Sequence, residues 1–136
     1  MRKLFIIVLI YFFYSSTITA EVVKKIDISG NNRVSEETIK IYGDIKINEN
    51  YSEQDLNKIL NNLFLTNFFE DVQIELSNNI LSIKLIEHPV INNLIIIGET
   101  RNKYIEQIKK VLKSKEKDSY IKNNIAKDID IIKQLY

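Results

Sequence analysis

The chain has 136 residues, enough for one or two small domains, and carries 19 basic and 18 acidic side chains. Without the first twenty residues, which hold Arg2 and Lys3 and no acids, the formal charge becomes −1. This balance lacks the basic excess expected of a nucleic-acid-binding protein, and the absence of cysteine excludes a disulfide framework and a thiolate metal site.

Residues 1–20 have the plan of a secretory signal peptide. A basic start precedes an apolar run from Leu4 to Tyr14, and a polar stretch ends at Ala20. The run fits the about 7–15 apolar residues of a signal peptide and is shorter than the about 20 of a membrane span. Ile18 is bulkier than the small residues preferred near a cleavage site, so an uncleaved anchor is the alternative. We favour cleavage after Ala20 and export.

Residues 22–43 predict a strand, a turn and a short helix. The strand covers 22–30, with Ile26 and Ile28 on one face, and Gly30 begins the turn. Ser35 is placed to cap the helix, which we expect to end at Gly43. The inner face of this helix is predicted to consist of Val34, Thr38, Ile41 and Tyr42.

A longer helix begins after Ser52 and changes abruptly into a strand. Its core-facing side chains follow helical spacing: Leu56, Ile59, Leu60, Leu63 and Phe64. The helix must end directly after Thr66, and Asn67 is expected in the left-handed conformation that glycine usually supplies. Phe69 is the expected core anchor, and Phe68 is expected to be half exposed.

The following strand is a candidate edge for strand addition. Strict alternation places Val72, Ile74 and Leu76 inward and Gln73 and Glu75 outward. Asn78-Asn79 suits a two-residue turn into a third strand, 80–87, which is apolar on both faces in places, as in a central strand. Neither proline nor a bulge signal interrupts 72–76. Its unpaired backbone groups could bind another strand, or could simply be kept soluble by the flanking charges.

The β-α-α order then starts again after Pro89. Gly98 lies 68 positions after Gly30, and residues 91–99 predict a strand in which Leu94 and Ile96 match Ile26 and Ile28. Two helices follow, with apolar stripes of Tyr104, Ile105, Ile108, Val111 and Leu112, and of Ile121, Ile125, Ile129, Ile132 and Tyr136. No hairpin follows the second helix. We therefore expect partly uncovered apolar faces at Leu94, Ile96, Ile108 and Ile129.

The residue inventory does not favour catalysis or a cofactor. The only histidine, His88, lies beside Pro89 between the two repeats, where a solvated linker residue is the usual role. Three glycines cannot form a phosphate-cradling loop. Glu70 and Asp71 are adjacent on a turn, so their carboxylates should diverge rather than form an acid–base pair. We expect no enzyme activity and no cofactor or metal.

The stretch from Leu63 to Leu76 resembles the POTRA repeats of the BamA family of outer-membrane β-barrel assembly factors. The matching positions after the second helix are Phe64, Thr66, Phe69, Glu70, Asp71 and Val72, and Asn67 occupies the family's glycine. Gly30, Arg33 and Val34 match its "G-x-x-R-V" turn, and "IEHP" matches its "E-x-P" junction. Glu99 stands where an asparagine usually follows Gly98, and Tyr136 matches the first aromatic of a "Y-x-x-x-G-Y" signature.

The resemblance implies an α+β fold of β-α-α-β-β repeats, each with a mixed three-stranded sheet covered by a helix pair. It divides the chain into a signal peptide (1–20), a first domain (21–89) and a second domain (90–136) that lacks its hairpin. In the sheet, 80–87 would lie between 22–30 and 72–76, so that 72–76 forms an edge. The second repeat would then be incomplete, and the chain a fragment or a truncated gene product.

The family's function would place the chain on the periplasmic side of the outer membrane of a Gram-negative bacterium. There these repeats receive unfolded outer-membrane proteins delivered by chaperones and dock accessory lipoproteins, with β-augmentation as one mode. The alternatives are a POTRA domain of an FtsQ-type cell-division protein, which would keep its N-terminal anchor and normally carries one repeat, or of a two-partner secretion transporter.

Overall fold

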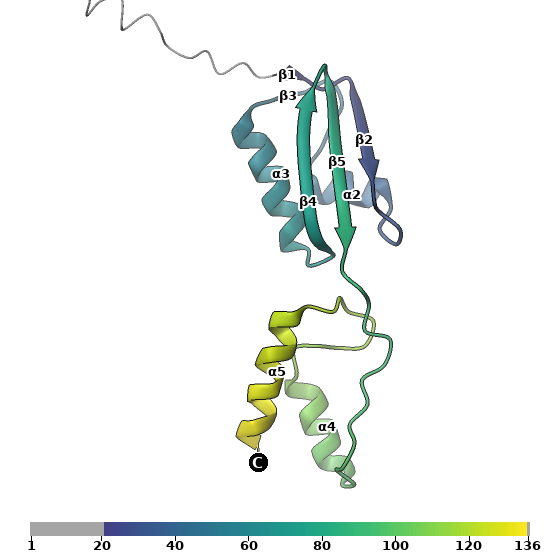
Figure 1. The fold of residues 1–136 in the computed structure, drawn as a ribbon, viewed down its shortest axis with the longest axis vertical. Coiled ribbons are helices and arrows are strands. Elements are labelled where there is room, and N and C mark those ends of the chain that lie inside the picture. Colours follow the sequence, from purple (N-terminus) through teal and green to yellow (C-terminus); the bar gives the residue numbers. More distant parts are fainter. Residues whose placement is uncertain (1–20, 136) are drawn as a thin grey trace, which may run out of the picture.

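The computed structural model describes residues 21–135, so the predictions for residues 1–20 and Tyr136 lie outside it. Figure 1 shows two units along the long axis of the molecule. The first unit, 21–87, contains a sheet and two helices, and the second unit, 88–135, contains two helices. No helix in the described range is both long and apolar enough to cross a bilayer.

The main sheet has three strands, β2 (Lys25–Ser29), β4 (Phe69–Ser77) and β5 (Ile80–Glu87), in the order β2-β5-β4. β5 is parallel to β2 and antiparallel to β4. The predicted α+β class and the central place of the third strand are confirmed. β4 lies at one edge and β2 at the other (Figure 1).

The predicted strand 22–30 is wrong as a single element. β1 (Glu21–Val22) pairs with β3 (Asn50–Tyr51), and β2 begins only at Lys25. Between them the chain turns so that the Val23 N–H donates to the Glu49 carbonyl and the Lys24 N–H to the Asn79 carbonyl. This break places the Val23 side chain in the core, which the alternation of 22–30 did not predict.

Helices α2 (Glu36–Gly43) and α3 (Glu53–Leu65) begin at the predicted caps. The Thr38 N–H donates to Ser35 Oγ at 3.2 Å, and Ser52 forms a reciprocal capping box with Asp55. The core beneath them joins both helices to the sheet. Its buried members are Val23, Ile39, Ile45, Tyr51, Ile59, Leu63, Phe69, Val72, Leu81, Ile83 and Leu85.

The predicted inner face of α2 is partly wrong, although Val34 packs against the core as predicted. Ile39 is fully buried, whereas Ile41 is 76% exposed and Tyr42 is half exposed. The helix ends at Gly43 as predicted, and the left-handed residue that follows it is Asp44, with φ of 53°. An eight-residue helix offers two possible apolar lines, and packing against the sheet selects the one through Ile39.

The switch from α3 to β4 occurs as predicted. Asn67 has φ of 59°, and Thr66 Oγ1 donates to the Leu63 carbonyl while it accepts from the Phe68 N–H. Phe69 is buried at 2% exposure, and the half-buried Phe68 contacts Tyr42 edge to face with ring centroids 5.9 Å apart. The predicted roles of both phenylalanines are confirmed.

Replacing Asn67 tests how much the left-handed residue contributes. Asn67→Ala should lower the free energy of unfolding by about 1 kcal/mol, because alanine is penalised in this conformation, and Asn67→Gly should cause no loss. Urea unfolding followed by circular dichroism measures both. Asn61→Ala, at an exposed position inside α3, serves as the control. An equal loss for Asn61→Ala and Asn67→Ala would contradict the prediction.

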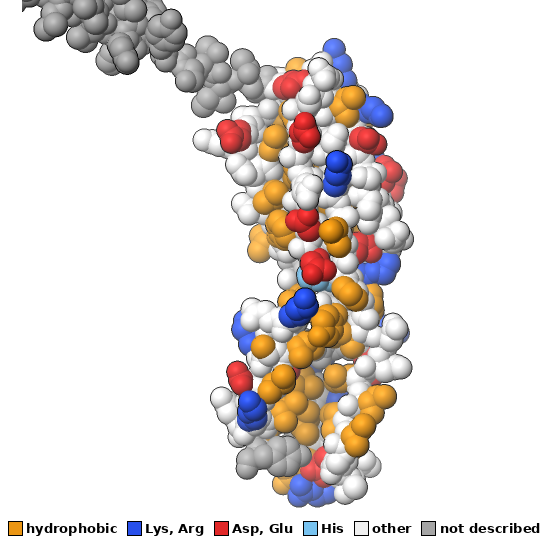
Figure 2. All heavy atoms as spheres, in the orientation of Figure 1, with side chains coloured by type: hydrophobic (Ala, Val, Ile, Leu, Met, Phe, Trp, Pro, Cys, Tyr) orange, Lys and Arg blue, Asp and Glu red, His pale blue; other side chains and the backbone are white. Residues whose placement is uncertain are grey.

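The second unit contains α4 (Asn102–Val111) and α5 (Lys122–Leu135), but the predicted strand at 91–99 is wrong. Residues 92–97 have no strand pairing, and Ile95 and Ile97 are mostly exposed. A strand needs a neighbour for its N–H and C=O groups, and no described segment lies beside this one in a sheet. Figure 2 shows hydrophobic side chains gathered on the visible face of this unit.

The apolar stripe of α5 is partly wrong. Asp128 is buried at 5% exposure, whereas the neighbouring Ile129 is 48% exposed. Asp128 accepts hydrogen bonds from the Lys113 and Ser114 N–H groups at 2.6 and 2.9 Å, so its side chain closes the end of α4. Ile129 is uncovered as predicted, and Leu94 and Ile96 are partly exposed. Ile108 is buried, contrary to the prediction.

Candidate functional site

The hydrogen-bonding register of β4 determines which of its backbone groups face outward. Asn78 and Asn79 both have positive φ and form the predicted two-residue turn, so Ser77 and Ile80 are a hydrogen-bonded pair. Such pairs alternate along an antiparallel ladder. The N–H and C=O groups of Gln73 and Glu75 therefore face β5. Those of Val72, Ile74 and Leu76 face the free edge.

No backbone hydrogen bond from 72–76 to a segment other than β5 occurs among the described residues. The side chains follow the predicted alternation: Val72 is buried, Ile74 and Leu76 pack on the core, and Gln73 and Glu75 are exposed. The prediction that no bulge interrupts 72–76 is confirmed, because the single register shift of this ladder lies between Phe69 and Asp71. The bulge lies at the start of β4 and leaves the ladder regular from Asp71 to Ser77.

The outer face around this edge is polar. A shallow hollow of about 310 Å³ is lined by Gln73, Ile74, Glu75, Ser82 and Lys84. Glu70 is exposed, whereas Asp71 accepts a hydrogen bond from Gln73 Nε2 at 3.0 Å. Glu70 and Asp71 share no hydrogen-bond partner, as expected if their carboxylates diverge. Groups of three or more metal-binding side chains do not occur in the described range.

The carboxylate of Glu87, at the end of β5, holds the turn after β2. It accepts hydrogen bonds from the N–H groups of Asn32, Arg33 and Val34 at 2.9–3.2 Å. Arg33 Nε donates to Glu87 Oε2 at 3.1 Å. Burial disfavours the charged carboxylate, but these hydrogen bonds and the Arg33 charge outweigh it and lower the pKa of Glu87.

Gly30 and Arg33 were predicted to belong to this turn, but no role was predicted for Glu87. Gly30 has φ of 85° and lies against the backbone of Leu85. Glu87 could have been found from its place in the "E-x-P" junction. Asp128 carried no such signal, because nothing in α5 marks it as a buried acceptor.

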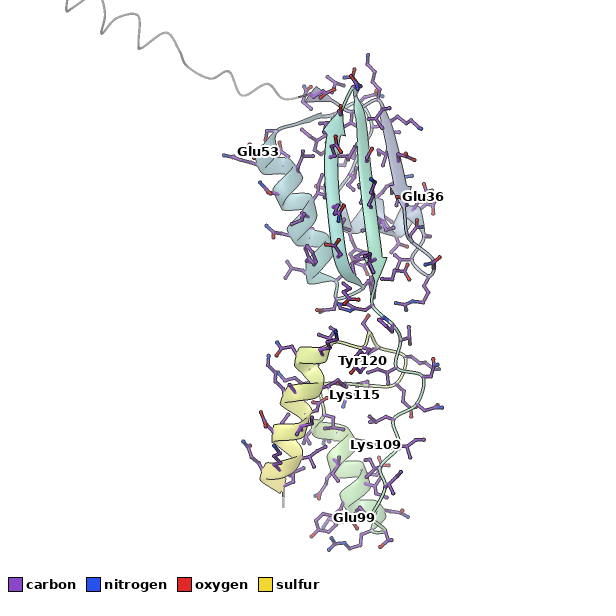
Figure 3. All side chains as sticks on the ribbon, viewed as in Figure 1. Glu36, Glu53, Glu99, Lys109, Lys115 and Tyr120 are labelled. Atoms are coloured by element: carbon purple, nitrogen blue, oxygen red, sulfur yellow. The ribbon has the colours of Figure 1, made fainter. Side chains whose placement is uncertain are left out.

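The turn at Gly98 repeats the first turn in part. Gly98 has φ of 95°, and Arg101 stands three residues later, as Arg33 does after Gly30. Arg101 donates to both carboxylate oxygens of Glu99 and lies 4.0 Å from the centre of the Tyr104 ring. Figure 3 shows Glu99 at the far tip of the second unit and Tyr120 at the end of the same unit that lies toward the sheet. No role was predicted for Arg101 from the sequence.

A family model described as POTRA, surface antigen variable number repeat, matches residues 21–87. Residues 21–87 are a POTRA domain. The match covers both helices and all three strands of the main sheet, including the free edge.

Two curated relatives are BamA proteins. The chain is 30% identical over 126 residues to the outer membrane protein assembly factor BamA of Neorickettsia risticii, and 30% identical over 76 residues to that of Neisseria meningitidis serogroup B. These alignments cover 91% and 56% of the chain. The chain spans only 17% and 10% of the relatives' lengths.

Solved POTRA structures share the fold. The N-terminal domain of Omp85 from Thermosynechococcus elongatus matches 87% of the chain and 52% of its own, with a TM-score of 0.59 at 14% identity. POTRA1-2 of Omp85 from Anabaena matches 88% of the chain and 81% of its own, with a TM-score of 0.54 at 12% identity. The POTRA assignment thus agrees with both sequence and fold.

Proposed function

We propose that the POTRA domain is a periplasmic protein-binding module of an outer-membrane protein assembly factor. The observation that carries the proposal is the free edge of β4, where Val72, Ile74 and Leu76 direct their backbone groups outward. An extended segment of a partner would pair there, as in β-augmentation. This role requires neither a cofactor nor catalysis.

The names of the two BamA relatives support a role in outer-membrane protein assembly. They are named outer membrane protein assembly factors. The clients would be unfolded outer-membrane proteins delivered by periplasmic chaperones, and accessory assembly lipoproteins would dock on the same module. An unfolded membrane strand has about ten residues of alternating polarity, a length comparable to the nine residues of β4. The division into domains 21–89 and 90–136 stays a prediction.

We prefer the edge at β4 over the edge at β2 as the binding site, because β4 is longer and its ladder is regular. β2 has only five residues. β4 offers nine residues and an unbroken ladder beyond its bulge.

Proline at Ile74 tests strand addition, because this residue's N–H faces outward and not toward β5. Ile74→Pro should abolish cross-linking of a synthetic amphipathic strand peptide to a photoreactive side chain placed at Gln73. Ile74→Ala removes the same side chain but keeps the N–H, so it should retain cross-linking. Gln73→Pro is a poor test, since its N–H belongs to the β5 ladder.

Both variants must keep the circular dichroism spectrum of the parent protein. Equal cross-linking by Ile74→Pro and Ile74→Ala would contradict strand addition at β4. Loss in both variants would show that the side chain, and not the backbone edge, carries the binding.

A further inference from the structure

The segment between the two units is tied to the second unit by backbone hydrogen bonds. Val90 and Ser119 form an antiparallel bridge. The Tyr120 N–H donates to the Pro89 carbonyl at 2.7 Å, and the Ile91 N–H donates to the Asp118 carbonyl at 2.9 Å. Residues 89–91 therefore form a short ribbon with 117–120 and move with the second unit.

The first unit holds this ribbon through His88. The His88 N–H donates to the Phe68 carbonyl at 2.9 Å, and Arg33 Nη2 donates to the His88 carbonyl at 2.9 Å. Among the described residues, Arg33 makes the only side-chain hydrogen bond from the first unit to residues beyond Glu87. A change in orientation between the units must break or strain these contacts.

Arg33 is itself held rigidly by the first unit. Its Nε donates to Glu87 Oε2, and its own backbone N–H donates to the same carboxylate. The guanidinium thus bridges a side chain at the end of β5 and the first carbonyl of the linker. One planar group with several donors can make both bonds at once, which a lysine ammonium does less well.

The cleft between the units offers little electrostatic attraction between its walls. It has a volume of about 350 Å³, and its charged lining residues are Arg33, Lys113, Lys117 and Asp118. Arg33 is the only charged lining residue from the first unit and is already paired with Glu87, whereas the other three belong to the second unit. The contacts at the junction are therefore the ones that hold this arrangement.

We propose that Arg33 is a positioning residue that latches the second unit to the first through the His88 carbonyl. The hinge lies at residues 87–89, and Glu87 fixes the latch. The orientation of the two units is then set by the contacts of His88, in which this guanidinium is the side-chain donor, and not by a large interface. The inference concerns the junction alone and does not depend on binding at β4.

The chain has no cysteine, so two introduced cysteines can be labelled without side reactions. Asn57→Cys in α3 and Lys127→Cys in α5 are exposed positions on opposite sides of the junction. Spin labels at these sites report the distance between the units by double electron–electron resonance. The parent should give a narrow distribution. Arg33→Ala should raise the fraction of open conformers by about tenfold, the order expected for losing a charge-assisted hydrogen bond.

Arg101→Ala is the matched control. Arg101 occupies the same place after its glycine, but its described partners Glu99 and Tyr104 belong to the second unit. This variant should leave the distribution narrow. Arg33→Lys keeps a charge beside Glu87, so it should preserve the fold and still broaden the distribution. If circular dichroism shows that Arg33→Ala has unfolded the first unit, the distance distribution of Arg33→Lys is used in its place.

An unchanged distribution in a folded Arg33→Ala protein would overturn the latch, and so would an unchanged distribution in Arg33→Lys. Equal broadening in Arg33→Ala and Arg101→Ala would also overturn it, because the effect would then be a general loosening of the chain.

Discussion

Gly30→Ala is expected to destabilise the POTRA domain by about 4 kcal/mol or more, enough to unfold much of it at room temperature. A Cβ at this position would overlap the carbonyl oxygen of Leu85 and lie 3.0 Å from its carbonyl carbon. Both are backbone atoms of the central strand and cannot move aside. The φ of 85° adds strain of its own. Urea unfolding followed by circular dichroism should show the loss.

Gly98→Ala separates these two causes. Gly98 has a similar φ of 95°, but a Cβ there would meet nothing within 4 Å. This variant should lose only the about 1–2 kcal/mol that a left-handed alanine costs. If both variants lose the same stability, the close approach to Leu85 contributes nothing.

Glu87→Ala should destabilise the same domain by about 2–3 kcal/mol, the size expected for losing charge-assisted hydrogen bonds to a nearly buried carboxylate. The Glu87 side chain is 6% exposed, and three N–H groups and Arg33 lose their common acceptor. Glu87→Gln keeps one acceptor oxygen and should lose less. A smaller loss in Glu87→Ala than in Glu87→Gln would contradict this account.

The same residue should make stability depend on pH. The pKa of Glu87 is lower in the folded domain than its usual value of 4.5. Its contribution is therefore fully present above pH 4.5 and is lost as the pH falls through the lower, folded value. Unfolding midpoints at pH 7 and pH 3 should differ less in Glu87→Gln than in the parent protein. Equal differences would show that other carboxylates, such as Asp128, carry the acid sensitivity.

Local signals in the sequence were enough to predict the order of the two helices and of the three main-sheet strands of the first domain, but not the short β1–β3 pair. Ser35 and Ser52 cap their helices, Asn67 ends α3 in the left-handed conformation, and Asn78-Asn79 turns β4 into β5. Each of these features depends on a few neighbouring residues. The alternation of 72–76 also gave the correct inward face, because its period is a property of the strand itself.

Features that depend on distant partners were predicted poorly. The sequence could not select Ile39 over Ile41 as the buried side chain of α2, since the sheet makes that choice. Residues 92–97 have the pattern of a strand but no described neighbour with which to pair. Asp128 interrupts an apolar stripe because the end of α4, fourteen residues away, needs an acceptor.

The sequence by itself thus determined where α2 and α3 begin, how the β4–β5 hairpin turns, and which side chains of β4 point inward. Only the tertiary structure decided that Glu87 holds the turn at Gly30 and that Arg33 reaches the linker. The reason is physical: caps and alternation act over a few residues. A buried carboxylate and its donors meet only after chain segments more than fifty residues apart have come together.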